Sequence, residues 1–136
     1  MSQENVETIR HMIETANASG WDAEALVNDW VHPEARMYPA PDFPGPDVYV
    51  GREDIVTFVR EWTSTFDDLR WDLEQVIDLG DRVLVLARMT GRSGTTGTAI
   101  DWPFGGVFGD FRDGLFAEAR YFMDQNAALE AVGLKE

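Results

Sequence analysis

The chain contains no cysteine and only one lysine, Lys135, among its 136 residues. Without cysteine it can form no disulfide, no thiolate nucleophile and no cysteine-based metal site. Its 11 basic residues face 25 acidic ones, which gives a formal net charge of -14. A charge of this sign repels phosphate backbones and anionic lipids, so neither nucleic acid nor a membrane surface is an expected partner.

Long apolar runs and localisation signals are also missing. No stretch approaches the roughly 18 consecutive apolar residues of a membrane span, and "MSQENVETIR" lacks the basic start and apolar run of a signal peptide. We therefore expect a cytoplasmic protein. The two histidines, His11 and His32, do not fall in a metal-ligand spacing such as His-Glu-x-x-His, so we predict no metal site and expect no cofactor.

Apolar residues make up 44% of the chain and aromatic residues 12%, which is typical of a single globular domain over residues 1–136. Apolar side chains at helical spacing predict three helices in the first half. The first ends at Gly20, the second begins at the N-cap Asp22 and ends before Pro33, and the third covers residues 51–66. The proline-rich segment between the last two predicts a strand followed by a long loop of the kind that often covers a binding site.

From Leu69 onward the apolar period changes to two and turn signals recur. Helices followed by an antiparallel meander indicate the α+β class, with the helices on one face of a curved sheet. The predicted strands cover residues 70–79, 82–92, 95–111 and 115–123, and a short helix starts near Asn126.

Charged residues interrupt two of these strands. In "VLVLARMT" one face is wholly apolar, whereas the other face passes from Leu84 and Leu86 to Arg88 and Thr90. In "LFAEARYFM", one face likewise carries Glu118 and Arg120 between Phe116 and Phe122. Pattern alone favours solvent-facing charges, because most strand charges are solvated. The alternative is an apolar pocket with a few polar groups.

Asp101, in "TAIDWPF", is a carboxylate flanked by Ile100, Trp102, Pro103 and Phe104. An apolar site would raise its pKa toward the range of a general acid or base. The alternative is an ordinary aspartate on a strand surface. Aromatic walls for a pocket could come from Tyr38, Trp62 and Trp102 together with Trp30, each of which could equally be core.

Four phrases of the sequence resemble the SnoaL-like branch of the nuclear transport factor 2-like superfamily: "HPEARMYPAP", "YVGREDIVTFVREW", "VLVLARMTGRSG" and "FRDGLFAEARYFMDQNAALEAVGL". The resemblance implies a cone-shaped α+β barrel, in which three N-terminal helices pack on a strongly bent antiparallel sheet with a short C-terminal helix. It also implies a deep pocket and a homodimer formed through the outer face of the sheet. Members include polyketide cyclases, ketosteroid isomerases, dehydratases and limonene-type epoxide hydrolases, besides pure binding modules.

Two known catalytic sets of the superfamily are missing. Where the steroid isomerases have their catalytic aspartate, this chain has Pro39. Where they have a tyrosine on the first helix, it has Met12 or Ile13. The limonene-type Arg-x-Asp motif falls on residues 88–90, where Arg88 is kept but Thr90 replaces the aspartate. The second aspartate of that set is replaced by Arg120, so epoxide hydrolysis by paired aspartates is not expected.

The resemblance places Arg88, Thr90, Glu118 and Arg120 on the pocket side of the sheet. From it we predict a pocket for an apolar, oxygenated small molecule, in which the two arginines polarise a ligand oxygen and Asp101 or Glu118 accepts a proton. The predicted ligand-binding residues are Tyr38, Trp62, Arg88, Thr90, Trp102 and Arg120. Two functions stay open: a cofactor-independent enzyme of the cyclase or isomerase type, and a non-catalytic ligand-binding or dimerisation module.

Overall fold

The computed structural model describes residues 2–41 and 45–134. Within these residues the chain forms four helices and six strands. Part of the predicted proline-rich loop, residues 42–44, lies outside the described residues. None of the described helices is both long and apolar enough to cross a membrane. The helices are α1 (Ser2–Ser19), α2 (Ala23–Trp30), α3 (Gly51–Thr63) and α4 (Gln125–Ala131).

All six described strands form one sheet in the order β2-β1-β6-β5-β4-β3. The sheet is mixed and open, because β1 runs parallel to β6 while every other neighbouring pair is antiparallel. The predicted α+β class is confirmed, and the purely antiparallel sheet of that prediction is corrected at this one pair. The strands are β1 (Val31–Tyr38), β2 (Tyr49–Val50), β3 (Phe66–Asp78), β4 (Arg82–Ser93), β5 (Ala99–Arg112) and β6 (Leu115–Phe122).

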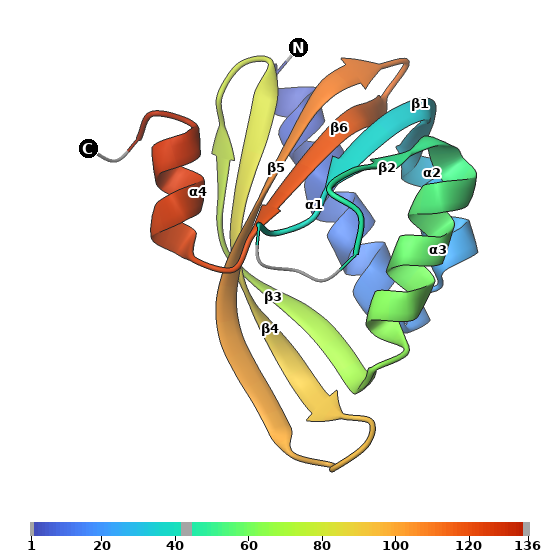
Figure 1. Cartoon of the computed structure of the whole chain (residues 1–136). Coiled ribbons are helices and arrows are strands. Elements are labelled where there is room, and N and C mark those ends of the chain that lie inside the picture. The colour runs from blue at the N-terminus through green and yellow to red at the C-terminus, as the bar shows by residue number, and fades with distance from the viewer. Residues whose placement is uncertain (1, 42–44, 135–136) are drawn as a thin grey trace.

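The three N-terminal helices cover one face of the sheet and α4 covers part of the other (Figure 1). We call these the inner and outer faces. The apolar alternation of β4 explains why both are covered. The inner face packs on the helices through Val83, Val85, Ala87 and Met89, and the outer face packs on α4 through Leu84 and Leu86.

The helix boundaries follow local signals in the sequence. Gly20 has a φ of 74°, a left-handed conformation that ends α1, and Asp22 caps α2 by accepting a hydrogen bond from the backbone N–H of Ala25 at 3.3 Å. The third helix is shorter than predicted, since it ends at Thr63 and Phe66 begins β3. Phe66 still packs on the main core, which explains why its spacing fitted the helix.

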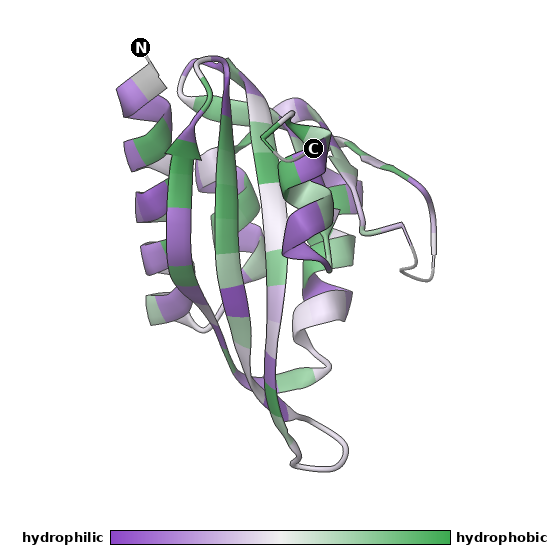
Figure 2. Ribbon diagram, turned by 90° about the vertical axis from the view of Figure 1, so that its left-hand side faces the viewer, coloured by the Kyte–Doolittle hydropathy of each residue, from purple (hydrophilic) through white to green (hydrophobic). Residues whose placement is uncertain are grey.

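Two adjacent glycines let other residues approach β5 closely. A Cβ at Gly105 would lie 2.6 Å from the Cβ of Ala128 on α4, and one at Gly106 would lie 3.3 Å from the ring of Tyr121. Gly105 therefore allows α4 to dock on the outer face, which Figure 2 presents with the C-terminal helix in front of the sheet. Gly106 makes room for Tyr121 on the inner face.

We predict that Gly105→Ala displaces α4 and lowers the free energy of unfolding by about 1–3 kcal/mol, the usual cost of overpacking. Chemical denaturation would measure the loss. Gly109→Ala is the matched control, because it adds a methyl to the same strand and face against the flexible side chain of Arg82 at 3.1 Å. Equal losses in both variants would contradict the close contact between α4 and β5.

Candidate functional site

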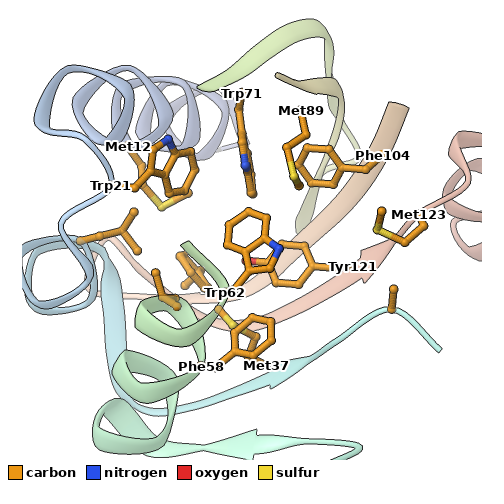
Figure 3. Close-up of a pocket in the computed structure, with 14 residues that line it drawn as sticks. Met12, Trp21, Met37, Phe58, Trp62, Trp71, Met89, Phe104, Tyr121 and Met123 are labelled. Atoms are coloured by element: carbon orange, nitrogen blue, oxygen red, sulfur yellow. The ribbon is translucent and has the colours of Figure 1, made fainter. Parts of the chain in front are cut away.

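An apolar cavity of about 50 Å³ lies between the inner face of the sheet and helices α1 to α3. Figure 3 shows its side chains converging from the helices and the strands. None of the described lining residues carries a charge at neutral pH. They are Met12, Trp21, Leu26, Met37, Ala40, Phe58, Val59, Trp62, Trp71, Met89, Phe104, Phe116, Tyr121 and Met123.

Methionine is concentrated at this cavity. The chain has five methionines, and all except Met1 line it: Met12, Met37, Met89 and Met123. An unbranched thioether side chain adopts several shapes at low cost, which lets a methionine-lined wall adjust to what it holds. The cavity therefore combines a small resting volume with adaptable walls.

Only a few polar atoms face this apolar surrounding, among them the buried indole N–H of Trp71 and the hydroxyl of the partly buried Tyr121. Trp71 is 4% exposed, and its indole N–H is buried with no hydrogen-bond partner among the described residues. The structure gives the Tyr121 hydroxyl no hydrogen bond within the described residues either, and burial raises the pKa of this phenol well above its ordinary value of 10.0. Tyr121 is therefore a neutral phenol at physiological pH, able to donate a hydrogen bond.

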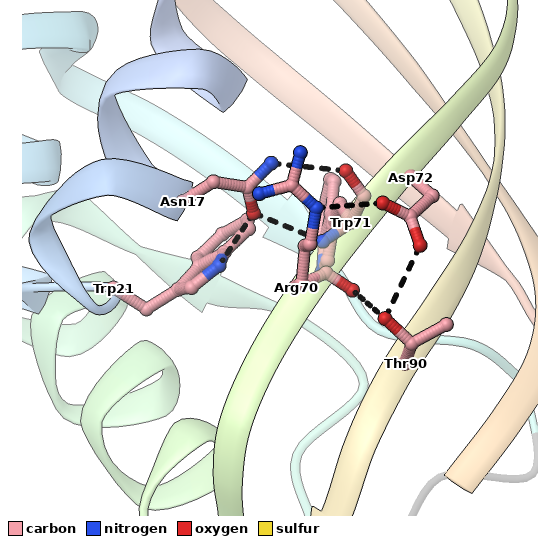
Figure 4. A network of polar contacts seen from close by, with 6 residues as sticks. All are labelled: Asn17, Trp21, Arg70, Trp71, Asp72 and Thr90. Carbon is pink, nitrogen blue, oxygen red and sulfur yellow. Dashed lines mark hydrogen bonds and ion pairs between the residues drawn. The ribbon is translucent and has the colours of Figure 1, made fainter.

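The position of Trp71 is held by Asn17 of α1 (Figure 4). The Asn17 amide accepts a hydrogen bond from the backbone N–H of Trp71 at 3.0 Å and donates one to its carbonyl oxygen at 3.0 Å. The same amide oxygen accepts a hydrogen bond from the indole N–H of Trp21 at 3.2 Å. One side chain thus orients two of the tryptophans that line the cavity.

The sequence placed Arg88, Thr90 and Asp101 at a pocket, whereas the structure places them on the outer face. Arg88 donates a hydrogen bond to the carboxylate of Asp101 at 2.6 Å, and the two side chains are 40% and 62% exposed. This ion pair raises the pKa of the guanidinium. Thr90 donates a hydrogen bond to Asp72 at 3.3 Å, and Figure 4 shows this bond beside the Asn17 contacts.

Glu118 and Arg120 form a second group on the outer face. They pair at 3.0 Å, and the guanidinium of Arg120 lies 4.0 Å from the centre of the Tyr38 ring. The predicted position of Arg88, Thr90, Glu118 and Arg120 beside the helix-covered pocket was wrong, although the last two do line an open hollow on the outer face. The physical reason lies in β4, where the wholly apolar set of side chains packs on the helices and turns the mixed set outward.

Of the six predicted ligand-binding residues, Trp62 alone lines the cavity. Trp102 packs beside the main core against Phe66, and its indole N–H is buried without a partner among the described residues. Sequence reasoning missed Trp71, Tyr121 and the four methionines. A usable signal was present, because Tyr121 and Met123 share one face of their strand with two alanines and no charge.

Comparisons with known proteins agree with this architecture. The model of the SnoaL-like domain matches residues 9–119. A protein from Jannaschia sp. CCS1, assigned by its name to the SnoaL-like polyketide cyclases, superposes with a TM-score of 0.75 at 26% identity, over 98% of this chain and 94% of its own. No curated protein sequence matches the chain.

Two further solved structures share the fold at lower identity. A nuclear transport factor 2-like protein from Burkholderia pseudomallei has a TM-score of 0.74 at 19% identity, with 96% and 98% of the two chains covered. The epoxide hydrolase/cyclase-like enzyme SalBIII has a TM-score of 0.72 at 19% identity, with 90% and 93% covered.

We predict that Asn17→Ala lowers the free energy of unfolding by about 2–3 kcal/mol, because three hydrogen bonds are lost and the backbone of Trp71 is left unpaired. Gln3→Ala is the control, because it also removes a side-chain amide from α1. The Gln3 amide makes only an exposed hydrogen bond of 3.4 Å to Glu7, so its loss should change the free energy of unfolding by less than about 0.5 kcal/mol. Urea titration followed by tryptophan fluorescence would compare the two variants. Similar small losses in both would contradict the role of Asn17.

Proposed function

Because the chain belongs to the SnoaL-like domain family, we propose that its inner cavity binds a small, uncharged and largely apolar molecule. The observation that carries this proposal is the described lining, which contains aromatic, aliphatic and methionine side chains and no ionised group. A pocket of this composition binds apolar surface through the hydrophobic effect.

The same lining disfavours a charged ligand. Moving an ion from water into an apolar site is costly unless an opposite charge receives it. Arg88, Arg120, Asp101 and Glu118 are the residues from which such a charge was predicted, and they belong to the outer face. The proposal therefore gives them no role in the cavity.

The size of the cavity limits the ligand. At about 50 Å³ it is well below the roughly 300–1,000 Å³ of a pocket for a drug-sized molecule. A compact ligand of a few carbon atoms is the best match, and the methionine walls allow some expansion on binding.

Binding without catalysis is the better supported of the two functions that the sequence leaves open. Proton-transfer catalysis needs an acceptor within hydrogen-bond reach of the substrate, and the described lining offers no carboxylate or imidazole. A cyclase or isomerase activity is the second candidate. It is favoured by the cyclase-type names of two structural relatives and by Tyr121, a neutral phenol that could donate a hydrogen bond to a substrate oxygen.

We also propose a homodimer formed through the outer face of the sheet, as the family resemblance implies. The part of this face that α4 leaves uncovered carries ion pairs such as Arg88 with Asp101. These pairs would then lie in or near the contact between the two copies.

We predict that methylenecyclopentane binds in the cavity, whereas cyclopentanecarboxylate and cyclopentylammonium bind at least tenfold more weakly. Tryptophan fluorescence and thermal shift would report binding, since three tryptophans line the cavity. Ala40→Leu should weaken binding by filling the space, and Ala25→Leu on the exposed side of α2 is the matched control. Equal affinity for charged and neutral probes, or no effect of Ala40→Leu, would count against the proposal.

A second prediction separates binding from catalysis. Cyclopentanone in D₂O exchanges its α-hydrogens when a base removes them, and NMR follows the rate directly. A binding module should leave this rate at its value in protein-free buffer. An acceleration that disappears in Ala40→Leu would instead establish a proton-transfer enzyme.

A further inference from the structure

Two hydrogen-bond donors lie in the wall of the apolar cavity without a described partner. The indole N–H of Trp71 is buried and unpaired within the described residues, and the Tyr121 hydroxyl has no described hydrogen bond. An indole nitrogen donates and cannot accept, whereas a phenol can do either. Native proteins leave few buried donors unpaired, so the buried indole N–H of Trp71 needs an acceptor that the described residues do not supply.

The two donors belong to one site. The rings of Trp71 and Tyr121 meet edge to face, with centroids 6.2 Å apart, and Figure 3 shows both side chains among those that converge on the cavity. They come from β3 and β6, which lie on either side of β5 and β4 in the sheet. A ligand between the helices and the sheet would therefore meet both.

Both side chains are held in place before any ligand arrives. Asn17 fixes the backbone of Trp71, and the indole is packed between Trp21 at 4.6 Å and Phe104 at 4.4 Å, as centroid distances. Tyr121 lies against its cross-strand partner Gly106, which leaves room for the ring. Donors held in this way lose little conformational freedom on binding.

We propose that the ligand carries a carbonyl oxygen, and that the indole N–H of Trp71 and the hydroxyl of Tyr121 donate hydrogen bonds to it. This inference rests on the proposed function and narrows its ligand class to small neutral ketones, aldehydes and esters. A carbonyl oxygen has two lone pairs and can accept from both donors at once. The remaining carbon skeleton meets the methionine and aromatic walls.

An organic cation fits the same aromatic walls less well. Binding of a quaternary ammonium group requires ring faces arranged around an open space. Here the rings of Trp21, Trp62 and Trp71 already contact one another, with centroids 4.6 to 6.0 Å apart. Unpaired N–H and O–H groups also present their positive ends, which disfavours a cation.

The test compares cyclopentanone with methylenecyclopentane, which have the same ring and differ in C=O against C=CH₂. Tyr121→Phe should weaken cyclopentanone binding roughly threefold to tenfold, the usual effect of one hydrogen bond, and leave methylenecyclopentane within twofold. Trp71→Phe should act in the same direction if it folds. Tyr38→Phe, on the outer face, is the control and should leave both affinities unchanged.

The outcomes separate the two proposals. If neither probe binds the wild-type chain, the proposed function fails. If both bind and Tyr121→Phe changes their affinities by the same factor, the cavity binds apolar molecules and the carbonyl inference is overturned. That second result would also follow if water, rather than a ligand oxygen, satisfies the two donors.

Discussion

The hydrogen bonds between Asn17 and the backbone of Trp71 are the contact on which the cavity depends. β3 is an edge strand, so on one side its N–H and C=O groups have no neighbouring strand to pair with. Asn17 supplies both a donor and an acceptor from α1 at this point. It thereby replaces a short piece of strand, ties the first helix to the sheet and sets the indole of Trp71 against the cavity. Because the same amide holds Trp21, two cavity walls are fixed by one side chain.

The two faces of the sheet divide the chemistry of the molecule. The inner face and the helices form a cavity whose described lining is uncharged, whereas ion pairs such as Arg88 with Asp101 and Arg120 with Glu118 lie outside it. Exposed ion pairs of this kind contribute little to stability. The selectivity proposed for the cavity comes from the absence of charge together with two donors, the buried indole N–H of Trp71 and the hydroxyl of the partly buried Tyr121. These properties suit a small neutral carbonyl compound better than the ligand expected from the family resemblance, whose oxygen would be polarised by two arginines.

Much of the fold could be predicted from the sequence, because its signals are local. Gly20 and Asp22 mark the end of one helix and the start of the next, and the change from helical to alternating spacing separates helices from strands. The facing of the strands depends on a longer-range choice. In β4 the wholly apolar set, Val83, Val85, Ala87 and Met89, identifies by its composition the face that packs on the helices. The prediction instead followed the family resemblance, which placed Arg88 on the pocket side. The parallel contact between β1 and β6, and the pairing of Asn17 with Trp71 across 54 positions, leave no local trace.

The most direct measurement is the indole region of a ¹⁵N–¹H spectrum, in which each tryptophan gives one N–H signal and Trp71→Phe identifies that of Trp71. If the account is right, cyclopentanone moves the Trp71 signal downfield, as expected for a new hydrogen bond, while methylenecyclopentane perturbs it much less. A Trp71 signal that responds identically to both ligands would show that its N–H receives no carbonyl oxygen, and would contradict the role given to this buried donor.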